Sequence, residues 1–380
     1  MIKKDIPLSK KNIIDGNISI SICPSCKRPT FFIKEKSYFE CLTCGIRGGL
    51  IEYIKYMKKD ISEKKIIDCL MKGDINESLY HEAINNNLQK AKRYKKMNLD
   101  ALNFFESQNN NKGIKYLKEV RKLSDETIKK FHLGYADNNW RSLIEYMTKL
   151  GYSPEELVDN SLAFKSSKGG EVFDFFNDRA MFPFVNKEGE ILGFGGRTLN
   201  NKDDRKYLNS KETVVYSKRK YLFDLYHLKA DNNKPVILVE GNLDVISLNQ
   251  AGFENAVASC GTALTEEQAK LIREKTSSVI ICYDDDDAGQ AATEKSIPIL
   301  RDAGLEVYVI SVNESKDPDE FINKFGSEAF QELIDNATPA IEYQTLEYQE
   351  KYSEETFIKR ILDCHYSDEE LIKCFAKYNI

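Results

Sequence analysis

The chain has 380 residues, of which 41% are hydrophobic and 30% charged, so it can form ordinary cores and is neither disordered nor collagen-like. No apolar run approaches the roughly 20 residues that a membrane span needs, and the opening MIKKDIPLSK lacks the apolar segment of a secretory signal. Nine cysteines, an odd number, predict a cytoplasmic protein whose thiols are reduced or bind metal.

Charge is distributed unevenly along the chain. Residues 1–70 carry 14 Lys and Arg against 8 Asp and Glu, a net charge of +6, whereas residues 232–335 carry 8 against 20, a net charge of −12. The basic part suits contact with a polyanion, and the acidic part suits the binding of cations. Ordinary variation of charge along a protein is the alternative explanation.

The first motif along the chain consists of two CxxC pairs. Cys23 and Cys26 are followed, after 14 intervening residues, by Cys41 and Cys44. Four thiolates from two such pairs provide the tetrahedral ligand set that Zn²⁺ prefers, and they leave no open position for catalysis. The sequence between the pairs predicts a hairpin. Basic and aromatic residues in this module favour nucleic-acid binding, although the aromatic residues could equally form the module's own small core.

The next 160 residues show weaker patterns. Residues 71–98 are polar and rich in Asn and Lys, which predicts a linker that is partly helical, and residues 101–130 show helical spacing with an interruption at 109–113. Residues 173–198 contain two apolar runs around Glu188 and Gly189, which predict a β-hairpin.

From Lys234 onward, short apolar runs alternate with helical segments. Strands are expected at 236–239, 256–259, 279–283 and 306–310, with helices between them and Thr265 opening a capping box. This alternation predicts an α/β unit with a mainly parallel sheet. Residues 321–380 are expected to be helical.

Carboxylates follow three of these predicted strands. They occur in three pairs, which are Glu240 with Asp244, Asp284 with Asp286, and Asp317 with Asp319. In a parallel sheet the carboxyl ends of the strands meet at one edge, where ligands bind. Many oxygen ligands suit Mg²⁺ or Mn²⁺, and such ions serve phosphoryl or nucleotidyl transfer. A solvated acidic loop is the competing interpretation for the run from Asp284 to Asp287.

At these residues the chain resembles bacterial primases of the DnaG type. VEGNLDVISLNQAGFENAVASCGTALTEEQ, YDDDDAGQAA and SKDPDEF together resemble a TOPRIM pattern, and FHLGYADNNW, RAMFPFVNKEGEILGFGGR and KYLNSKETVVYSKRKYLF resemble the upstream half of the primase polymerase domain. The cysteine module with its trailing GIRGGLIEYI resembles the family's zinc-binding domain. The resemblance extends from about residue 17 to about residue 340.

The resemblance implies a fold and an organisation. The fold class is α/β (α+β overall), with a small zinc ribbon, an α+β polymerase domain that contains a TOPRIM parallel sheet, and short C-terminal helices. The implied parts are a zinc-binding domain at 1–70, a linker at 71–98, the N-terminal polymerase subdomain at 99–233, TOPRIM at 234–315, a helical end at 316–345 and a helical tail at 346–380.

The resemblance also implies an activity, a DNA-dependent RNA polymerase that makes short primers on single-stranded DNA from ribonucleoside triphosphates. Catalytic roles fall on Glu240, Asp284 and Asp286. Mg²⁺ or Mn²⁺, two ions or more, would be held by Glu240, Asp244, Asp284, Asp286, Asp317 and Asp319. Contacts to nucleotide or template would come from Arg179, Arg197, Lys206, Tyr207, Asn209 and Lys218. One structural Zn²⁺ would be held by Cys23, Cys26, Cys41 and Cys44.

The sequence departs from the family in places. Cys26 stands where the family has a zinc-binding His, and Arg179 is the only arginine retained in the segment before Met181. The chain is expected to lack the helicase-binding domain, so a replicative helicase is a partner only if it is contacted otherwise. A non-catalytic single-stranded-DNA-binding or recombination-mediator protein is the alternative, and a topoisomerase or TOPRIM nuclease is a further one.

The two CxxC pairs yield a first prediction. The protein should contain one tightly bound Zn²⁺ per chain, and Cys41→Ser or Cys44→Ser should unfold residues 20–50 while the rest stays folded, because so small a module depends on its metal. Metal analysis of freshly purified protein checks the ion. Protein without zinc that retains a folded module would contradict the assignment.

Overall fold

The computed structural model describes most of the chain from Glu77 onward. The described residues are 13–14, 18–21, 31–34, 38–41, 47–49, 77–108, 112–201, 203–229, 234–261, 263–378 and 380, with side chains from Gln89 onward. Three of the expected zinc ligands (Cys23, Cys26 and Cys44) and the side chain of Cys41 lie outside this description.

The first described strands form an antiparallel sheet in chain order. They are β1 (Ile13–Ile14), β2 (Ile18–Ser21), β3 (Phe31–Lys34), β4 (Tyr38–Cys41) and β5 (Arg47–Gly49). Strands β3 and β4 pair with Phe31 opposite Cys41, so the hairpin expected between the cysteine pairs is confirmed.

A second antiparallel sheet follows, with strand order β11-β10-β9-β6. Its members are β6 (Gly134–Ala136), β9 (Arg179–Val185), β10 (Ile191–Thr198) and β11 (Tyr207–Asn209). The predicted hairpin of β9 and β10 is confirmed, and Gly189 has the positive φ of 82° that its turn requires. Around the sheet lie α3 (Glu77–Ser107), α4 (Lys112–Lys115), a π-helical turn (Tyr116–Val120), α5 (Asp125–Lys130), α6 (Ser142–Lys149), α7 (Pro154–Asp159), and the paired strands β7 (Ala163–Lys165) and β8 (Val172–Asp174).

Helix α3 differs from the expectation for residues 71–98. It runs without a break across the proposed boundary at residue 98, because Tyr94 and Met97 are buried in the same core as Leu102 and Phe105. Between Gln89 and Lys96 the polar side chains lie mostly on the exposed side of the helix, and its apolar stripe packs with residues of β9 and β10.

The predicted α/β unit is confirmed as a sheet with strand order β13-β12-β14-β15-β16. Strands β12 (Val236–Val239), β13 (Ala256–Ala258), β14 (Ser278–Ile281) and β15 (Glu306–Val309) are parallel. The antiparallel β16 (Thr338–Pro339) was not expected, because two residues are too short to show a strand period. Four helices connect the strands: α8 (Asn242–Gln250), α9 (Glu266–Arg273), α10 (Asp287–Asp302) and α11 (Pro318–Asp335).

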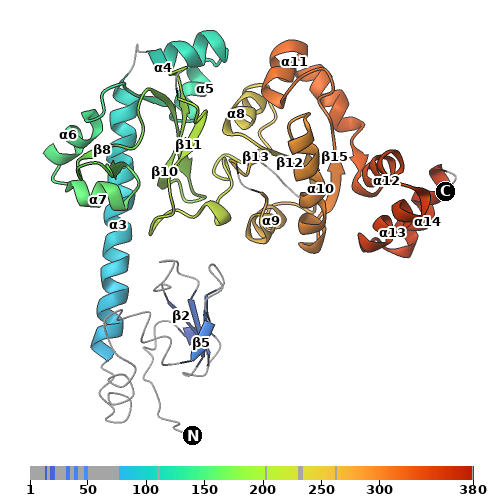
Figure 1. Ribbon diagram of the computed structural model, residues 1–380, viewed down its shortest axis with the longest axis horizontal. Coiled ribbons are helices and arrows are strands. Elements are labelled where there is room, and N and C mark those ends of the chain that lie inside the picture. The colour runs from blue at the N-terminus through green and yellow to red at the C-terminus, as the bar shows by residue number, and fades with distance from the viewer. Residues whose placement is uncertain are drawn as a thin grey trace, which may run out of the picture.

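Both faces of this sheet are covered, as its continuous apolar strands require. Ile237 and Val239 pack with α8 and α11, whereas Val236 and Leu238 pack with α9 and α10. Figure 1 shows α8 and α10 on opposite sides of β12. The chain therefore leaves β12 and β14 in opposite directions, and the crevice between their carboxyl ends is where ligands bind in such sheets.

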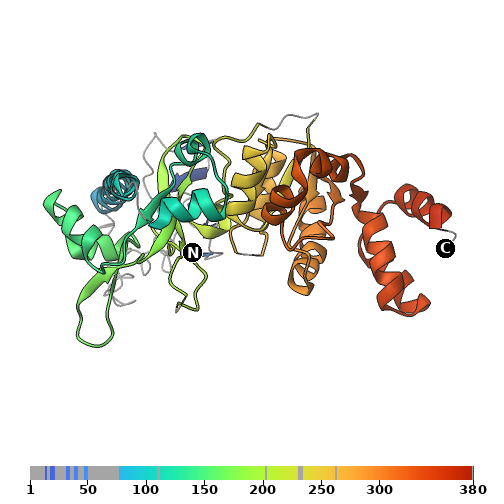
Figure 2. The same cartoon turned by 90° about the horizontal axis from the view of Figure 1, so that it is seen from above.

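The antiparallel sheet β11-β10-β9-β6 and the parallel sheet share one hydrophobic core. Phe184 of β9 packs against Tyr216, Tyr221 and Phe223, in the same cluster as strands β12 and β13. The backbone of Phe223 also pairs with Ala258 at the edge of the parallel sheet, with an N–H···O distance of 2.8 Å. The antiparallel sheet, the parallel sheet and the last helices follow one another along the molecule, and the view from above keeps this order (Figure 2).

The last residues are helical as expected, in α12 (Ala340–Lys351), α13 (Glu354–Asp363) and α14 (Asp368–Tyr378). The proposed boundary at residue 345 falls within α12, because Tyr348 is buried with Phe357 and Ile361 of the next helix. Among the described residues, no helix is both long and apolar enough to cross a membrane.

The shared core yields a second prediction. Phe184→Ala should lower the free energy of unfolding by about 3–5 kcal/mol, because it opens a cavity among fully buried aromatic rings. Thermal unfolding followed by circular dichroism should show one transition at a lower Tm, with both sheets lost together. Independent melting of the two sheets would contradict a common core.

Candidate metal and nucleotide site

A cavity of about 270 Å³ opens at the carboxyl end of the parallel sheet, beside β11. It is lined by Arg121, Lys206, Tyr207, Asn209, Glu240, Gly241, Asn242, Leu243, Asp244, Cys260, Gly261, Asp284, Lys316, Asp317 and Asp319. The three predicted carboxylate clusters therefore each contribute to one cavity, together with three of the predicted basic or polar residues of the other sheet.

Glu240 and Asp284 face each other across the crevice between β12 and β14. The backbone N–H of Asp284 donates to Glu240 Oε1 at 3.2 Å. Close approach of α10 holds this loop, since a Cβ on Gly289 would lie 2.0 Å from the carbonyl oxygen of Asp284. Burial raises the pKa of both carboxyl groups, and the Glu240 and Asp317 charges help to raise that of Asp284 to about 6.

Asp244 and Asp319 lie deeper and are already hydrogen-bonded by the protein. Asp244 accepts from the Gly241 N–H at 3.0 Å and from the Asp319 N–H at 3.4 Å. Asp319 accepts from Ser247 and forms an ion pair of 2.6 Å with Arg121. Burial and then the neighbouring carboxylates raise the pKa of Asp244 well above its usual range.

Asp286 and Asp317 each cap a helix. Asp286 Oδ1 accepts from the Ala288 and Gly289 N–H groups at 3.0 and 2.9 Å at the start of α10, and Asp317 Oδ1 accepts from the Glu320 N–H at 2.8 Å at the start of α11. Asp317 lines the cavity, whereas Asp286 is exposed beside it.

The carboxylates fit a hard divalent cation by their chemistry. Among the described residues, no donor forms a hydrogen bond with the side chain of Asp284. Within the same part of the chain, Glu240 and Asp317 each have one carboxylate oxygen that accepts no hydrogen bond. These oxygens are the donors that Mg²⁺ and Mn²⁺ prefer. Within the described part of the chain, no three His, Cys, Asp or Glu side chains already lie close enough together to hold an ion.

Three cationic side chains line the same cavity as the carboxylates. Lys206, Lys316 and Arg121 line it, and partial desolvation together with the charge of Lys316 lowers the pKa of Lys206. Arg197 does not line the cavity but lies over the rings of Tyr116 and Tyr207, at 5.0 and 5.8 Å from their centroids. Sequence reasoning missed Arg121, Lys316, Asn242 and Cys260, although three of these lie within or beside the quoted motifs.

Arg179 and Lys218 were also expected to contact nucleotide or template, and neither lines the cavity. Arg179 is 1% exposed, donates to the carbonyl oxygens of Gly196 and Arg205 and pairs with Asp203, so its guanidinium is used within the antiparallel sheet. Lys218 lies in a 3₁₀ turn (Lys218–Lys220), and its ammonium donates to the Gly261 carbonyl oxygen at 3.1 Å, at the rim of the cavity.

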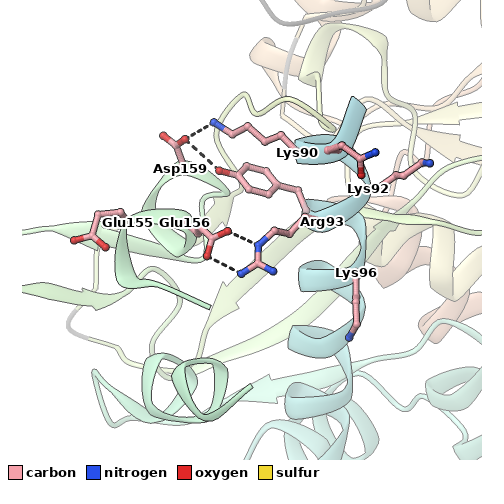
Figure 3. A pocket seen from close by; sticks show the side chains of 9 residues that line it. Lys90, Lys92, Arg93, Lys96, Glu155, Glu156 and Asp159 are labelled. Atoms are coloured by element: carbon pink, nitrogen blue, oxygen red, sulfur yellow. Dashed lines mark hydrogen bonds and ion pairs between the residues drawn. The ribbon is translucent and has the colours of Figure 1, made fainter. Parts of the chain in front are cut away.

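A second hollow, of about 780 Å³, lies on the surface between α3 and α7 (Figure 3). Its charges are largely paired across it. Lys90 pairs with Asp159 at 2.5 Å, and Arg93 forms a two-point pair with Glu156 that lowers the pKa of that carboxyl group to about 2. Because Glu156 and Asp159 already have cationic partners, this hollow is a poorer site for a cation than the first cavity.

Comparison with known proteins gives two family matches. Residues 101–229 match the DNA primase catalytic core, N-terminal domain, and residues 237–322 match a Toprim-like domain. The DNA primase of Clostridium acetobutylicum is 37% identical over 360 residues, which cover 91% of this chain and 59% of that protein. The chain therefore spans less than two thirds of the length of this relative.

Solved primase structures agree with these matches. A DNA primase domain from Pseudomonas aeruginosa is 31% identical, with a TM-score of 0.63 over 68% of this chain and 84% of that one. The zinc-binding and RNA polymerase domains of Aquifex aeolicus primase are 28% identical, with a TM-score of 0.67 over 97% of this chain and 92% of that one. A DnaG catalytic domain bound to single-stranded DNA is 29% identical, with a TM-score of 0.63 over 72% and 91%.

The charge arrangement yields a third prediction. The pKa of Asp284 is raised from its ordinary value of 3.8 to about 6, so the folded state holds the proton more tightly than the unfolded state. The resulting contribution to the stability of the metal-free fold is full at a pH below 3.8 and is lost as the pH rises through about 6. Asp284→Asn should therefore raise the free energy of unfolding at pH 8 by about 1 kcal/mol, after allowance for solvent screening.

Urea unfolding in the presence of a chelator measures this effect. Asp287→Asn is the matched control, because Asp287 is exposed and does not line the cavity. Equal changes in both variants, or a loss of stability in Asp284→Asn alone, would show that repulsion in the cavity is not the cause.

Proposed function

The chain belongs to the DnaG-type DNA primases, and from this membership we propose that it is a DNA-directed RNA polymerase that synthesises short RNA primers on single-stranded DNA. The observation that carries the proposal is the meeting of carboxylates from three strand ends with three cationic side chains in one cavity. Nucleotidyl transfer needs this combination, because a triphosphate must be bound while negative charge develops on its leaving group.

The side chains divide into two functional groups. Lys206, Lys316 and Arg121 supply positive charge for the triphosphate, and charge-assisted hydrogen bonds of this kind are stronger than neutral ones. Tyr207 and Asn209, on the edge strand β11, offer polar groups beside them. Arg197 stacks on Tyr207 and so supports its ring, and Lys218, whose ammonium donates to the Gly261 carbonyl oxygen at the rim, would contact nucleotide or template.

We assign the metal-holding role to Glu240, Asp284 and Asp317, with Asp286 beside them. Asp244 and Asp319 would support these residues, since their oxygens already accept bonds that fix α8 and α11 relative to each other. Bound Mg²⁺ or Mn²⁺, two or more ions, would activate the primer 3′-hydroxyl and neutralise charge on the pyrophosphate.

The remaining assignments rest on the relatives. The Aquifex structure contains a zinc-binding domain and aligns with 97% of this chain, which supports one structural Zn²⁺ within residues 1–70. A related catalytic domain binds single-stranded DNA, which supports such a template here. We propose the domain divisions given above, except that the boundaries at residues 98 and 345 fall within the continuous helices α3 and α12. We also propose ribonucleoside triphosphates as substrates and a cytoplasmic location, and a replicative helicase is a partner only if it is contacted otherwise.

A fourth prediction tests the function. Glu240→Gln should reduce primer synthesis on single-stranded DNA with Mg²⁺ by at least 100-fold, because it removes a charge needed in the transition state, while the Tm is unchanged or raised. Asp287→Asn should prime at the parental rate. Labelled ribonucleotides and gel analysis of the products provide the measurement.

Two results would contradict the proposal. If the parental protein binds single-stranded DNA but makes no primer at any Mg²⁺ or Mn²⁺ concentration, the chain is a binding module. If Glu240→Gln primes normally, the acidic cavity is not where the reaction takes place.

A further inference from the structure

Arg121 is held by two side chains in the wall of the cavity. Its Nη1 donates to Asp319 Oδ2 at 2.6 Å. Its Nε donates to the hydroxyl oxygen of Tyr116, whose ring centroid lies 5.5 Å from Arg121 Cζ. The third nitrogen, Nη2, has no acceptor among the described residues. Because the side chain lines the cavity and is 20% exposed, a ligand in the cavity can reach this guanidinium.

The position of Tyr116 depends on a π-helical turn. Residues 116–120 form the turn, and the Arg121 N–H donates to the Tyr116 carbonyl oxygen, five residues back, at 3.1 Å. Residues five apart lie on different sides of an α-helix with 3.6 residues per turn, whereas the wider π turn brings them to the same side. Such turns occur frequently at functional sites. Here the turn places the Tyr116 hydroxyl beside Nε of Arg121.

Asp319 is fixed by other donors besides Arg121. Its Oδ1 accepts from the Ser247 hydroxyl and from Asn323 Nδ2, the latter at 3.1 Å, and the residue is 3% exposed. A carboxylate can accept about four hydrogen bonds, and three donors already use this one. Asp319 therefore has little capacity left for a cation, and its Oδ2 is a fixed acceptor for the guanidinium.

Like charges gather near Arg121. The pKa of Lys206 is lowered, first by burial and then by the charges of neighbouring cations. Those cations are Lys316, Arg197 and Arg121. An anion bound among them relieves their repulsion, and phosphate oxygens accept strong charge-assisted hydrogen bonds from arginine. A guanidinium that is already held in place loses less conformational freedom on binding than a mobile one.

We propose that Tyr116 and Asp319 are positioning residues that hold Arg121 for a hydrogen bond from its Nη2 to a phosphate oxygen of the bound triphosphate. The inference rests on the proposed function and explains how the guanidinium assigned there is held. It also divides the motif Asp317-Pro318-Asp319 into two roles. Asp317 faces the cation, whereas Asp319 acts through Arg121.

The experiment uses inorganic tripolyphosphate, which reports phosphate contacts without those of base or sugar. Its Kd for the full chain is measured by equilibrium titration with Mg²⁺. Arg121→Ala should raise the Kd about ten- to a hundredfold, as expected for a hydrogen bond to a charged group. Tyr116→Phe keeps the ring and Asp319→Asn keeps the side-chain size, and each should raise the Kd about three- to tenfold.

A double-mutant cycle separates positioning from general structural support. In the Arg121→Ala background, Tyr116→Phe and Asp319→Asn should change the Kd no further, because their effects pass through the guanidinium. Tyr116→Phe leaves the buried carboxylates untouched, so it keeps the cycle informative if Asp319→Asn does not fold. Tyr152→Phe is the matched control. The Tyr152 hydroxyl donates to Asp100 at 2.7 Å outside the cavity, so its loss should lower the Tm and leave the Kd unchanged.

Manganese binding separates Asp319 from the carboxylates that hold the cation. Free Mn²⁺ is counted by electron paramagnetic resonance in the absence of phosphate ligands. Asp319→Asn should weaken Mn²⁺ binding much less than Asp284→Asn does, because the Asp319 oxygens are already used by protein donors. An equal loss in both variants would make Asp319 a metal ligand and overturn its assigned role.

The outcomes are distinct. An unchanged Kd in Arg121→Ala, or effects of Tyr116→Phe and Asp319→Asn that persist in the Arg121→Ala background, overturns the inference while the polymerase assignment stands. A parental protein that binds tripolyphosphate but makes no primer contradicts the proposed function, and the positioning of Arg121 is then judged by the cycle. A parental protein that makes primers but does not bind tripolyphosphate overturns the inference alone.

Discussion

Repulsion among carboxylates at the carboxyl end of the parallel sheet is the constraint on which the rest of the structure depends. Like charges in a partly buried cavity disfavour one another's ionisation, and burial adds to the cost. The fold holds them there through backbone donors. Gly241 donates to Asp244, and the N-termini of α10 and α11 donate to Asp286 and Asp317. Backbone bonds also join the loops, since Asp285 N–H donates to the Lys316 carbonyl oxygen at 3.0 Å.

The antiparallel sheet brings Lys206 and Tyr207 to the cavity, and the shared core fixes their position. Phe184 and the aromatic segment 221–223 bury the junction between the two sheets, and Phe223 adds a backbone pair at the edge of β13. Strand β11 is thereby held beside the crevice, with Lys206 and Tyr207 at the cavity. A rigid junction of this kind serves catalysis, because groups on two different units must hold a fixed geometry toward one substrate.

The parallel sheet and its carboxylates could be predicted from the sequence, because buried strands need continuous apolar runs and their carboxyl ends share one edge. The continuity of α3 across residue 98 could not, since Tyr94 is buried by segments more than 60 residues away and its neighbours are polar. The sequence predicted that Arg179 contacts nucleotide or template, but its guanidinium pairs with Asp203 and donates to two backbone carbonyl oxygens. These partners lie elsewhere in the chain and could not be predicted from the neighbouring sequence. Asn242 lay within a quoted motif, but its burial beside Gly195 and Asn209 depends on the other sheet, which the motif does not show.

The most direct test of the central claim is to locate the bound cation. Fe²⁺ replaces Mg²⁺ at oxygen-rich sites, and with ascorbate and peroxide it generates radicals that cut the backbone nearby. The account predicts cuts close to Glu240, Asp284 and Asp317, all suppressed by excess Mg²⁺. Cuts confined to other segments, or cuts at these positions that Mg²⁺ does not suppress, would contradict the claim that the three strand ends together form a divalent-cation site.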